Sequence, residues 1–288
     1  MNTAINVAAS VRARLLTRAK QQDMDYNLIL TKYALERLLY RLGVSQWADA
    51  FLLKGALLFD LWFDQPHRPT RDIDLLGFGS SDMADLISAF RTVCALPHDD
   101  GILFDPNTVR ATEIRKEANY AGVRVTLLGV LDGARCVVQI DVGFGDAVTP
   151  DAERMHYPVL LTGMLAPSIR AYPRFTVVAE KFEAMVSLGM ANTRLKDYFD
   201  VWYLVQHARL EPIVLLQAIT ATFARRGTPL PQSLPMGLSK EFARDPSKVK
   251  QWAAFLTKNK LQAPTLEVVI HELRQLLWET TCRPHTGP

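Results

Sequence analysis

Asp72 and Asp74 are the pair of residues in this sequence whose types and spacing most favour a chemical role. They stand two positions apart in Thr-Arg-Asp-Ile-Asp-Leu-Leu, a segment that reads as a short strand. On a strand, this spacing points both carboxylates to one face while the apolar residues beside them point into the core. The alternative is an ordinary strand with a solvated face, but aspartate is a poor strand former and two of them argue mildly against it. The pair is therefore a candidate metal site.

A third carboxylate, Asp141, lies in the middle of another apolar segment, Cys-Val-Val-Gln-Ile-Asp-Val-Gly-Phe-Gly. If the two strands are neighbours in a sheet, the three acids converge. Three carboxylates within a few Å do not all ionise comfortably without a cation. Oxygen ligands favour Mg²⁺, with waters and substrate phosphates completing its octahedron. This is the metal arrangement of phosphoryl and nucleotidyl transfer.

Basic residues near the acids indicate where a phosphate would bind. Lys54-Gly55-Ala56 precedes the acids by a helix-length interval, so backbone N–H groups at the start of a helix there would meet a phosphate. The alternative is a plain loop-to-helix turn with a surface lysine. Arg71, beside the acids, would either orient a triphosphate or offset the charge of the carboxylates.

A second charged cluster lies in the C-terminal half of the chain. Lys181 follows the start of one predicted helix, and Arg194, Lys196, Asp197 and Asp200 follow the start of the next. Arg194 and the two acids recur at steps of three and share a helical face, on which Lys196 would reach Asp200 at i+4. The alternative is a salt-bridged, exposed face. Large side chains around the cluster favour a packed surface instead; they are Phe182, Met185, Tyr198, Phe199, Trp202 and Tyr203.

Several enzyme classes are disfavoured by motifs that the sequence lacks. None of the 6 histidines pairs with another at helical ligand spacing, and no Gly-x-Ser-x-Gly, Walker or Gly-x-Gly-x-x-Gly motif occurs. This disfavours zinc proteases, serine hydrolases, P-loop enzymes and Rossmann dehydrogenases. The 3 cysteines are far apart and odd in number, which fits a reducing cytoplasm. Apolar stretches are too short for a membrane span of roughly 20 residues, so we expect a cytoplasmic protein.

Hydrophobic patterning predicts the elements that position these residues. Residues 26–43 have helical spacing with Gly43 as a C-cap, and 51–63 reads as a second helix entered through the Lys54-Gly55 turn. Residues 123–131 and 134–144 form a hairpin around Asp132-Gly133, a dipeptide suited to the positive φ angles of a tight turn. Five further helices are predicted over 176–190, 195–207, 212–223, 248–256 and 266–278, and the first 22 residues resemble an amphipathic helix.

The chain of 288 residues is long enough for two modest domains. We expect an N-terminal domain over 1–150, a proline-punctuated connector over 151–175 and a helical domain over 176–288. Residues 1–150 hold 16 Lys and Arg against 18 Asp and Glu, whereas 151–288 hold 17 against 12. The excess of basic residues over 151–288 would attract a polyanion such as a nucleic acid, although solvated helix faces produce similar charge imbalances.

Five segments, taken in order, resemble the AbiEii/AbiGii toxin family: 51–59, 68–76, 139–146, 179–184 and 192–200. The resemblance extends from about residue 25 to 265. The family is similar to DNA polymerase β type nucleotidyltransferases. The resemblance therefore implies an α+β fold, with a small mixed-sheet catalytic lobe followed by a mostly helical lobe and an active site in the cleft between them.

The resemblance also implies an activity and partners. It implies Mg²⁺-dependent use of a nucleoside triphosphate by the toxin of a type IV toxin-antitoxin or abortive-infection system, a form of phage defence, neutralised by an AbiEi-like antitoxin. Some related MenT toxins add nucleotides to the 3′ acceptor end of tRNA.

Site residues follow from the resemblance position by position. Asp72 and Asp74 match the metal-binding acids, and Asp141 falls where a third carboxylate is expected. The residues that match the nucleotide-binding turn and the triphosphate-binding motifs are Lys54, Gly55, Lys181, Arg194, Lys196, Asp197 and Asp200. The sequence departs from the family at Ala56, where many members have glycine or serine and then a hydroxyl residue.

The preferred hypothesis is that an acceptor hydroxyl, an RNA 3′ end, attacks the α-phosphate of a nucleoside triphosphate. Asp141 would complete the metal site and help to deprotonate the acceptor, Lys181 and Lys196 would neutralise the phosphates, and the basic helical lobe would hold the RNA. Two alternatives stay open: transfer to a protein or small molecule, and a non-catalytic nucleotide-binding module.

Overall fold

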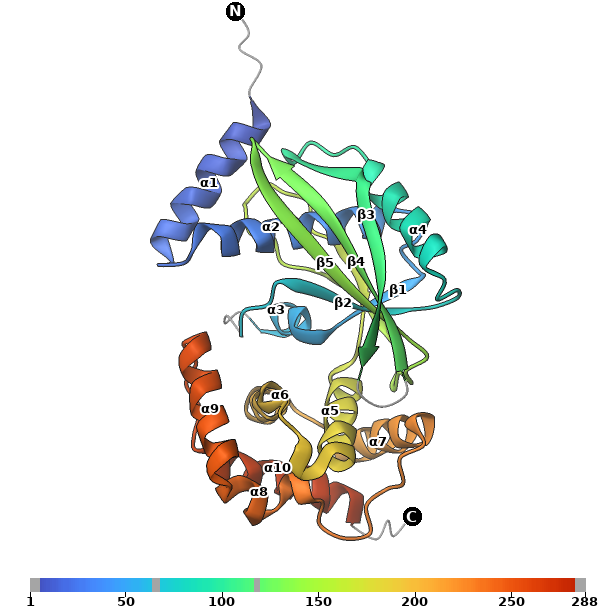
Figure 1. Ribbon diagram of the computed structural model, residues 1–288, viewed down its shortest axis with the longest axis vertical. Helices are drawn as coiled ribbons and strands as arrows, with labels where there is room; N and C mark the ends of the chain where they lie inside the picture. Colours follow the sequence, from blue (N-terminus) through green and yellow to red (C-terminus); the bar gives the residue numbers. More distant parts are fainter. Residues whose placement is uncertain (1–5, 64–67, 117–119, 283–288) are drawn as a thin grey trace, which may run out of the picture. The chain divides into compact units, whose positions relative to one another are not determined.

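The computed structural model describes residues 6–63, 68–116 and 120–282, which form two compact units (Figure 1). The first unit comprises residues 1–145 and 153–171, and the second comprises 146–152 and 172–288. All strands of the described residues belong to the first unit. The second unit is helical, so the α+β class predicted from the sequence is confirmed.

A mixed sheet of 7 strands forms the centre of the first unit, in the order β3-β4-β5-β2-β1-β7-β6. The strands are β1 (Phe51–Lys54), β2 (Asp72–Gly77), β3 (Ile102–Lys116), β4 (Tyr120–Leu131), β5 (Ala134–Phe144), β6 (Glu153–His156) and β7 (Ser168–Ala171). β2 pairs parallel with β5 and antiparallel with β1. The two strands that carry the predicted acids are therefore neighbours, as the convergence of those acids requires.

The hairpin of β4 and β5 has the predicted turn. Asp132 and Gly133 have φ angles of 46° and 77°, and the flanking residues Leu131 and Ala134 are register partners. The apolar side chains of β5 alternate into the core, where Val138 and Ile140 have no exposed surface. Because the side-chain period of a strand is two, Gln139 and Asp141 lie on the opposite face, as predicted.

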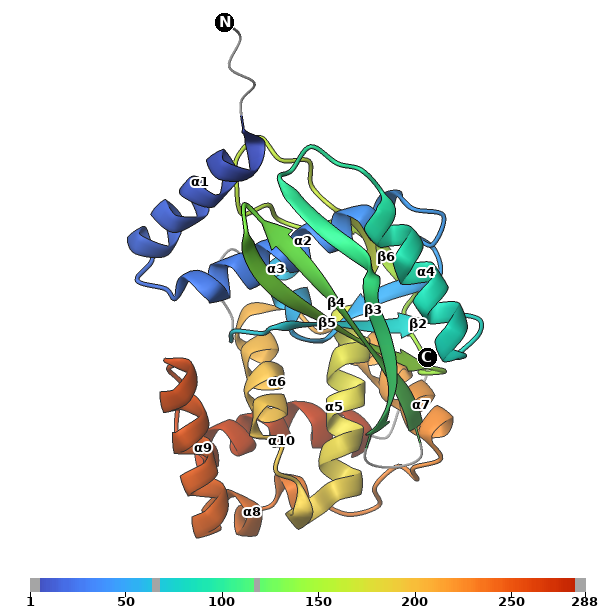
Figure 2. The same cartoon turned by 45° about the horizontal axis from the view of Figure 1, so that its top comes forward.

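Helices cover the apolar face of this sheet. The helices of the first unit are α1 (Val7–Gln21), α2 (Tyr26–Val44), α3 (Leu58–Trp62) and α4 (Met83–Ala95), with a 3-10 turn, η1, over Gly55–Leu57. α2 contacts β5 and β7, and α4 contacts β3 and β4. Figures 1 and 2 both show α2 running behind β4 and β5. The opposite face of β4 and β5 carries the half-buried and exposed residues and is called the polar face below.

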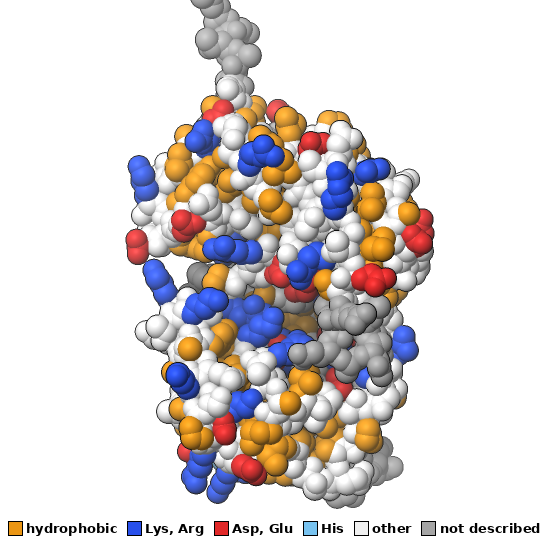
Figure 3. All heavy atoms as spheres, in the orientation of Figure 1, with side chains coloured by type: hydrophobic (Ala, Val, Ile, Leu, Met, Phe, Trp, Pro, Cys, Tyr) orange, Lys and Arg blue, Asp and Glu red, His pale blue; other side chains and the backbone are white. Residues whose placement is uncertain are grey.

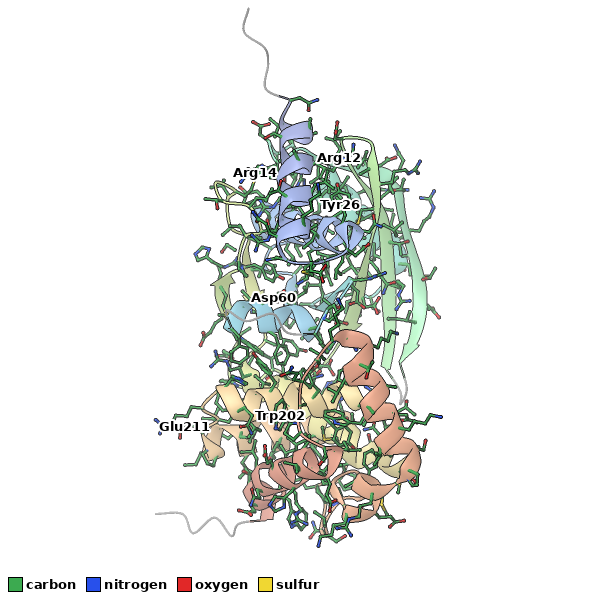
Figure 4. The ribbon with its side chains drawn as sticks, turned by 90° about the vertical axis from the view of Figure 1, so that its left-hand side faces the viewer. Arg12, Arg14, Tyr26, Asp60, Trp202 and Glu211 are labelled. Carbon is green, nitrogen blue, oxygen red and sulfur yellow. The ribbon has the colours of Figure 1, made fainter. Side chains whose placement is uncertain are left out.

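α1 confirms the helix expected at the N-terminus, and its arginines attach it to the first unit. Val11 and Leu15 are buried along one side. Arg12 donates to the carbonyl and the carboxylate of Asp132 at 3.1 and 3.2 Å, and Arg14 donates to the carbonyl of Thr162. Figure 4 shows both arginines on α1, near the start of α2. The basic character of this segment thus serves packing.

Two local predictions in the first unit were wrong. Residues 51–54 form strand β1 and not the start of a helix, because the run Phe-Leu-Leu fills a fully buried central strand position between β2 and β7. Gly43 lies inside α2, whose C-cap is Ser45. A Cβ at Gly43 would lie 2.3 Å from the carbonyl oxygen of Ser168, so the glycine allows the close approach of β7.

The predicted connector also differs from the structure. Residues 153–171 belong to the first unit, and β6 and β7 extend its sheet beyond β1. β6 has the sequence Glu-Arg-Met-His and is largely exposed, so no apolar alternation marked it in the sequence. Strand pairing with a distant segment decided its structure.

The second unit contains each helix predicted for it. Its helices are α5 (Arg174–Leu188), α6 (Leu195–His207), α7 (Pro212–Arg226), α8 (Lys240–Arg244), α9 (Pro246–Asn259) and α10 (Leu266–Cys282), with 3-10 turns over Gly189–Ala191 and Met236–Leu238. α5 packs on α6 and α7, and the rings of Phe182 and Phe223 lie 5.5 Å apart. Within the described residues, no helix is long and apolar enough to span a bilayer.

Candidate active site

Four charged residues form a transverse row across the sheet of the first unit. Arg124 on β4 is the register partner of Asp141 on β5, Asp141 is the partner of Asp74 on β2, and Asp74 is the partner of Lys54 on β1. Register partners point to the same face of a sheet. The row therefore places two carboxylates between two cations on the polar face.

Asp141 is bound through both of its oxygens. Nε of Arg124 donates to Oδ1 at 2.9 Å, and Nη2 donates to Oδ2 at 2.9 Å. This is the bidentate geometry in which charge-assisted hydrogen bonds are strongest. The hydrogen bonds to Asp141, and then the charges of Asp141, Asp72 and Asp74, raise the pKa of the Arg124 guanidinium. The arginine thus interacts electrostatically with all three acids.

Asp72 lies one pair further along the same face, beside Gln139 of β5. Its carboxylate accepts a hydrogen bond from the hydroxyl of Thr70, in the segment that leads into β2. Arg71, predicted either to orient a triphosphate or to offset the charge of the carboxylates, is exposed immediately before the strand. The alternation of β2 thus gives Asp72 and Asp74 a common face, while Ile73 is buried in the core.

Gly55 gives the carboxylate of Asp74 its space. Gly55 has a φ of +73°, a conformation that residues with a Cβ rarely adopt. A Cβ built at this position would lie 2.0 Å from Oδ2 of Asp74. The Lys54-Gly55 turn leads into η1 and the 5-residue α3, and not into the long helix that the sequence predicted. The observed role of the turn is to bring its backbone against Asp74.

The two carboxylates of β2, Asp72 and Asp74, have donor chemistry that fits a divalent cation. Protein Mg²⁺ is commonly held by one or two carboxylates, with substrate phosphates and waters as the other ligands. Among the described residues, no three His, Cys, Asp or Glu side chains are arranged to hold a metal ion. Both oxygens of Asp141, the third predicted ligand, accept hydrogen bonds from Arg124.

In the second unit, the predicted charged residues of α5 and α6 form a buried ion cluster. Nζ of Lys181 donates to Oδ1 of Asp197 at 2.5 Å and to Oδ2 of Asp200 at 2.9 Å. Nε of Arg194, the N-cap residue of α6, lies 2.7 Å from Oδ2 of Asp197. Both aspartates have no exposed surface. Lys196, predicted to reach Asp200, is exposed, and Asp200 accepts from Lys181 instead.

This cluster holds a lysine in a defined position. Burial by itself would raise the pKa of Asp197, but the charges of Lys181 and then Arg194 outweigh it, so the pKa lies below its ordinary value. Asp197 is therefore charged at neutral pH, and together with Asp200 it fixes the ammonium group of Lys181. The aromatic residues around the cluster pack as predicted, with Phe182 and Tyr198 fully buried.

The sequence reasoning missed Arg124, although the sequence contained its signal. The two-residue turn at Asp132-Gly133 fixes the register of the hairpin. Counting outward from that turn pairs Arg124 with Asp141, as observed. A fixed register, and not a motif, identifies this residue.

Comparisons with known proteins agree with this fold. A family described as "Nucleotidyl transferase AbiEii toxin, Type IV TA system" matches residues 37–277. Among curated proteins, no sequence matches the chain.

Two solved structures from Helicobacter pylori are similar to the chain. One is that of JHP933, with a TM-score of 0.53 and 14% identity, covering 89% of this chain and 93% of the other. The other is that of a protein described as a candidate nucleotidyltransferase, with a TM-score of 0.51 and 15% identity, covering 90% of this chain and 96% of the other. At such identities the likeness shows the fold alone.

The family match covers most of the chain, from the second half of α2 into α10, and includes both the row of charges and the ion cluster. Membership implies a nucleotide substrate and an antitoxin partner. The chain belongs to the AbiEii family of nucleotidyl transferase toxins of type IV toxin-antitoxin systems.

Proposed function

We propose that the protein transfers a nucleoside monophosphate from a nucleoside triphosphate to the 3′ end of an RNA, a tRNA, with release of pyrophosphate, in a reaction that depends on Mg²⁺. The observation that carries the proposal is the register of β2 and β5, which puts Asp74 beside Asp141 on one face with Asp72 next to them. Placing acids side by side on apolar strands costs folding free energy, and such a cost is typical of functional sites.

The acids of the first unit would hold the metal ion. Asp72 and Asp74 would be its ligands, and Asp141 the third ligand and the group that helps to deprotonate the acceptor hydroxyl. A divalent cation bound there supplies Lewis-acid stabilisation of the charge that develops on the phosphate. Gly55 contributes by leaving room for the Asp74 carboxylate, and Lys54, at the end of the row, offsets negative charge.

The basic residues would bind the phosphates of the nucleotide. We assign this role to Lys181, whose ammonium group two buried aspartates hold in place, and to Arg194, Lys196 and Arg71, which are exposed. Asp197 and Asp200 act as positioning residues, because they contact Lys181 and are themselves buried. Positive charge in fixed positions stabilises a phosphoryl transition state without reorganisation during the reaction. The excess of basic residues after position 150 would attract the RNA.

The antitoxin partner of the family would be an AbiEi-like protein that relieves the growth inhibition caused by this chain. Expression of the chain with and without such a protein, and of Asp72→Asn alone, tests this assignment. We expect growth inhibition by the wild type alone and normal growth in the other two cultures. Equal inhibition by Asp72→Asn would separate toxicity from transfer.

The transfer reaction is tested with purified protein. We would incubate the wild type, Asp72→Asn and Asp99→Asn with Mg²⁺, each of the four α-labelled nucleoside triphosphates and a mixture of total RNA and cell extract. Asp99 is the matched control, because it is an exposed aspartate of the same unit that lies outside β2 and outside the row. We expect label in a tRNA-sized band with the wild type and the control, and none with Asp72→Asn.

Other outcomes would redirect the proposal. Label in the protein fraction would make a protein the acceptor. No label from any nucleotide, together with nucleotide binding, would point to a binding module. Full transfer by a folded Asp72→Asn variant would refute the assignment of the acids.

A further inference from the structure

Arg124 is a charged residue at the site to which the proposed function gives no role. Its guanidinium makes two hydrogen bonds to Asp141, a residue with only 6% of its surface exposed. The arginine side chain itself is 38% exposed. A buried acid is thus covered by a cation whose own head reaches solvent.

Other arginines of the same hairpin region do not share this environment. Arg110 on β3 donates to the backbone carbonyls of Asn107 and Val109. Arg135 on β5 is the register partner of Val130 and is exposed. Figure 3 shows Lys and Arg side chains scattered over the face of the molecule that contains the sheet. The position of Arg124 beside three carboxylates is therefore specific to its place in the register.

A metal ion and Arg124 compete for the same atoms. Each oxygen of Asp141 accepts one guanidinium N–H and keeps a second lone pair, but a metal ion bound to that carboxylate would lie within a few Å of the guanidinium, and the two positive charges would repel each other. The arginine cannot resolve the conflict by losing its proton, because a guanidinium stays charged in proteins. A divalent cation at Asp141 therefore weakens the pair of Asp141 with Arg124.

We infer that Arg124 is a counter-ion that a divalent cation displaces from Asp141, and that the displaced guanidinium then binds a phosphate of the substrate. The inference rests on the proposed function, because it takes the metal and the triphosphate from there. The planar guanidinium fork matches a phosphate as well as it matches a carboxylate. Its exposed side allows the head to turn toward a ligand on the polar face. Arg124 would thus couple occupation of the metal site to nucleotide binding.

The first experiment measures metal affinity without catalysis. Mn²⁺ binding is followed by electron paramagnetic resonance of the free ion, for the wild type, Arg124→Gln and the matched control Arg135→Gln. Removal of the competing cation should tighten Mn²⁺ binding by Arg124→Gln on the order of tenfold, because the positive charge beside the Asp141 ligand has gone. Arg135→Gln also removes one positive charge from the polar face but should change the Kd by less than about twofold.

A double substitution shows whether the competition occurs at Asp141. Asp141→Asn should weaken Mn²⁺ binding, and adding Arg124→Gln to it should tighten binding by a smaller factor than Arg124→Gln does alone, because the shared ligand has gone and only the charges of Asp72 and Asp74 remain beside the arginine. If Arg124→Gln does not fold, Arg124→Lys replaces it. Lysine keeps the charge but lacks the two-point fork, and should tighten Mn²⁺ binding by a smaller factor.

The second experiment tests phosphate binding with inorganic tripolyphosphate and Mg²⁺ in a calorimeter. Arg124→Gln should bind tripolyphosphate on the order of tenfold more weakly than the wild type and Arg135→Gln do. A purely structural role would change the melting temperature and move neither affinity. Tighter metal binding combined with weaker tripolyphosphate binding is the signature of the displaced counter-ion.

Unchanged Mn²⁺ affinity in a folded Arg124→Gln variant would overturn the inference, and so would tripolyphosphate binding equal to that of the wild type. These results leave the proposed function intact if Asp72→Asn still abolishes transfer. Full transfer by Asp72→Asn would instead refute the proposed function, whatever Arg124 does.

Discussion

Replacement of Gly55 by alanine should displace the carboxylate of Asp74, and the structure gives the size of the displacement. The new Cβ would lie 2.0 Å from Oδ2 of Asp74 and 2.7 Å from its Cβ and Cγ. Atoms of this kind do not approach within 3.0 Å, so the carboxylate or the turn must move by about 1 Å. A displacement of about 1 Å at a catalytic group costs on the order of 100-fold in rate.

Backbone strain adds a cost in stability that is separate from the collision. Gly55 has a φ of +73°, and an alanine in this region costs roughly 1 to 2 kcal/mol. Gly133 offers a matched control, because its φ is +77° and a Cβ there meets nothing within 4 Å. Gly133→Ala should therefore carry the strain without the collision.

Thermal unfolding and the labelled-nucleotide assay separate the two effects. We expect both variants to melt a few degrees lower, at about 2–4 °C for each kcal/mol. Transfer should fall on the order of 100-fold in Gly55→Ala and stay near the wild-type rate in Gly133→Ala. Near-normal transfer by Gly55→Ala would refute the reasoning, because Asp74 would then tolerate the displacement. An equal loss in Gly133→Ala would show that strain, and not Asp74, limits activity.

Three further changes test the packing that supports the site. Asp197→Asn leaves Lys181 with one of its two carboxylates, and should lower the free energy of unfolding by about 3 kcal/mol, measured by urea unfolding. As a control, Glu267→Gln removes an acid of an exposed ion pair and should leave the urea midpoint of unfolding unchanged. Burial raises the pKa of Asp197, but its cationic neighbours lower it by more, so the unfolded state takes up the proton first as pH falls. The stability advantage of the wild type over Asp197→Asn should therefore be complete at neutral pH and shrink below pH 3.8. Urea titrations at several pH values would measure this. Gly43→Ala puts a Cβ 2.3 Å from the backbone oxygen of Ser168, and should cost about 1 to 3 kcal/mol in thermal unfolding, since backbone cannot move aside as a flexible side chain does.

Much of the fold could be predicted from local pattern. Helical spacing predicted α2 and, in the second unit, α5, α6, α7, α9 and α10, because a surface helix must bury one stripe and expose the other. Alternation and the Asp132-Gly133 turn predicted the hairpin of β4 and β5. The sequence offered no comparable pattern for β6, whose residues are mostly exposed, or for the first residues of the 51–63 segment. A short apolar run fits a buried strand and a buried helix equally well, and only its pairing with β2 and β7 decides between them.

The candidate site, like the fold, has some features that the sequence determines and others that only the tertiary structure decides. The sequence by itself determined which residues carry charge, that Asp72 and Asp74 share a face, and that Arg194, Asp197 and Asp200 share another, since these relations follow from the periods of strand and helix. The tertiary structure alone decided that β2 lies beside β5, that Lys181 and not Lys196 holds Asp200, and that Gly55 packs against Asp74. These contacts join residues far apart in the chain, and their formation depends on burial of the whole sheet and bundle, which no local period encodes.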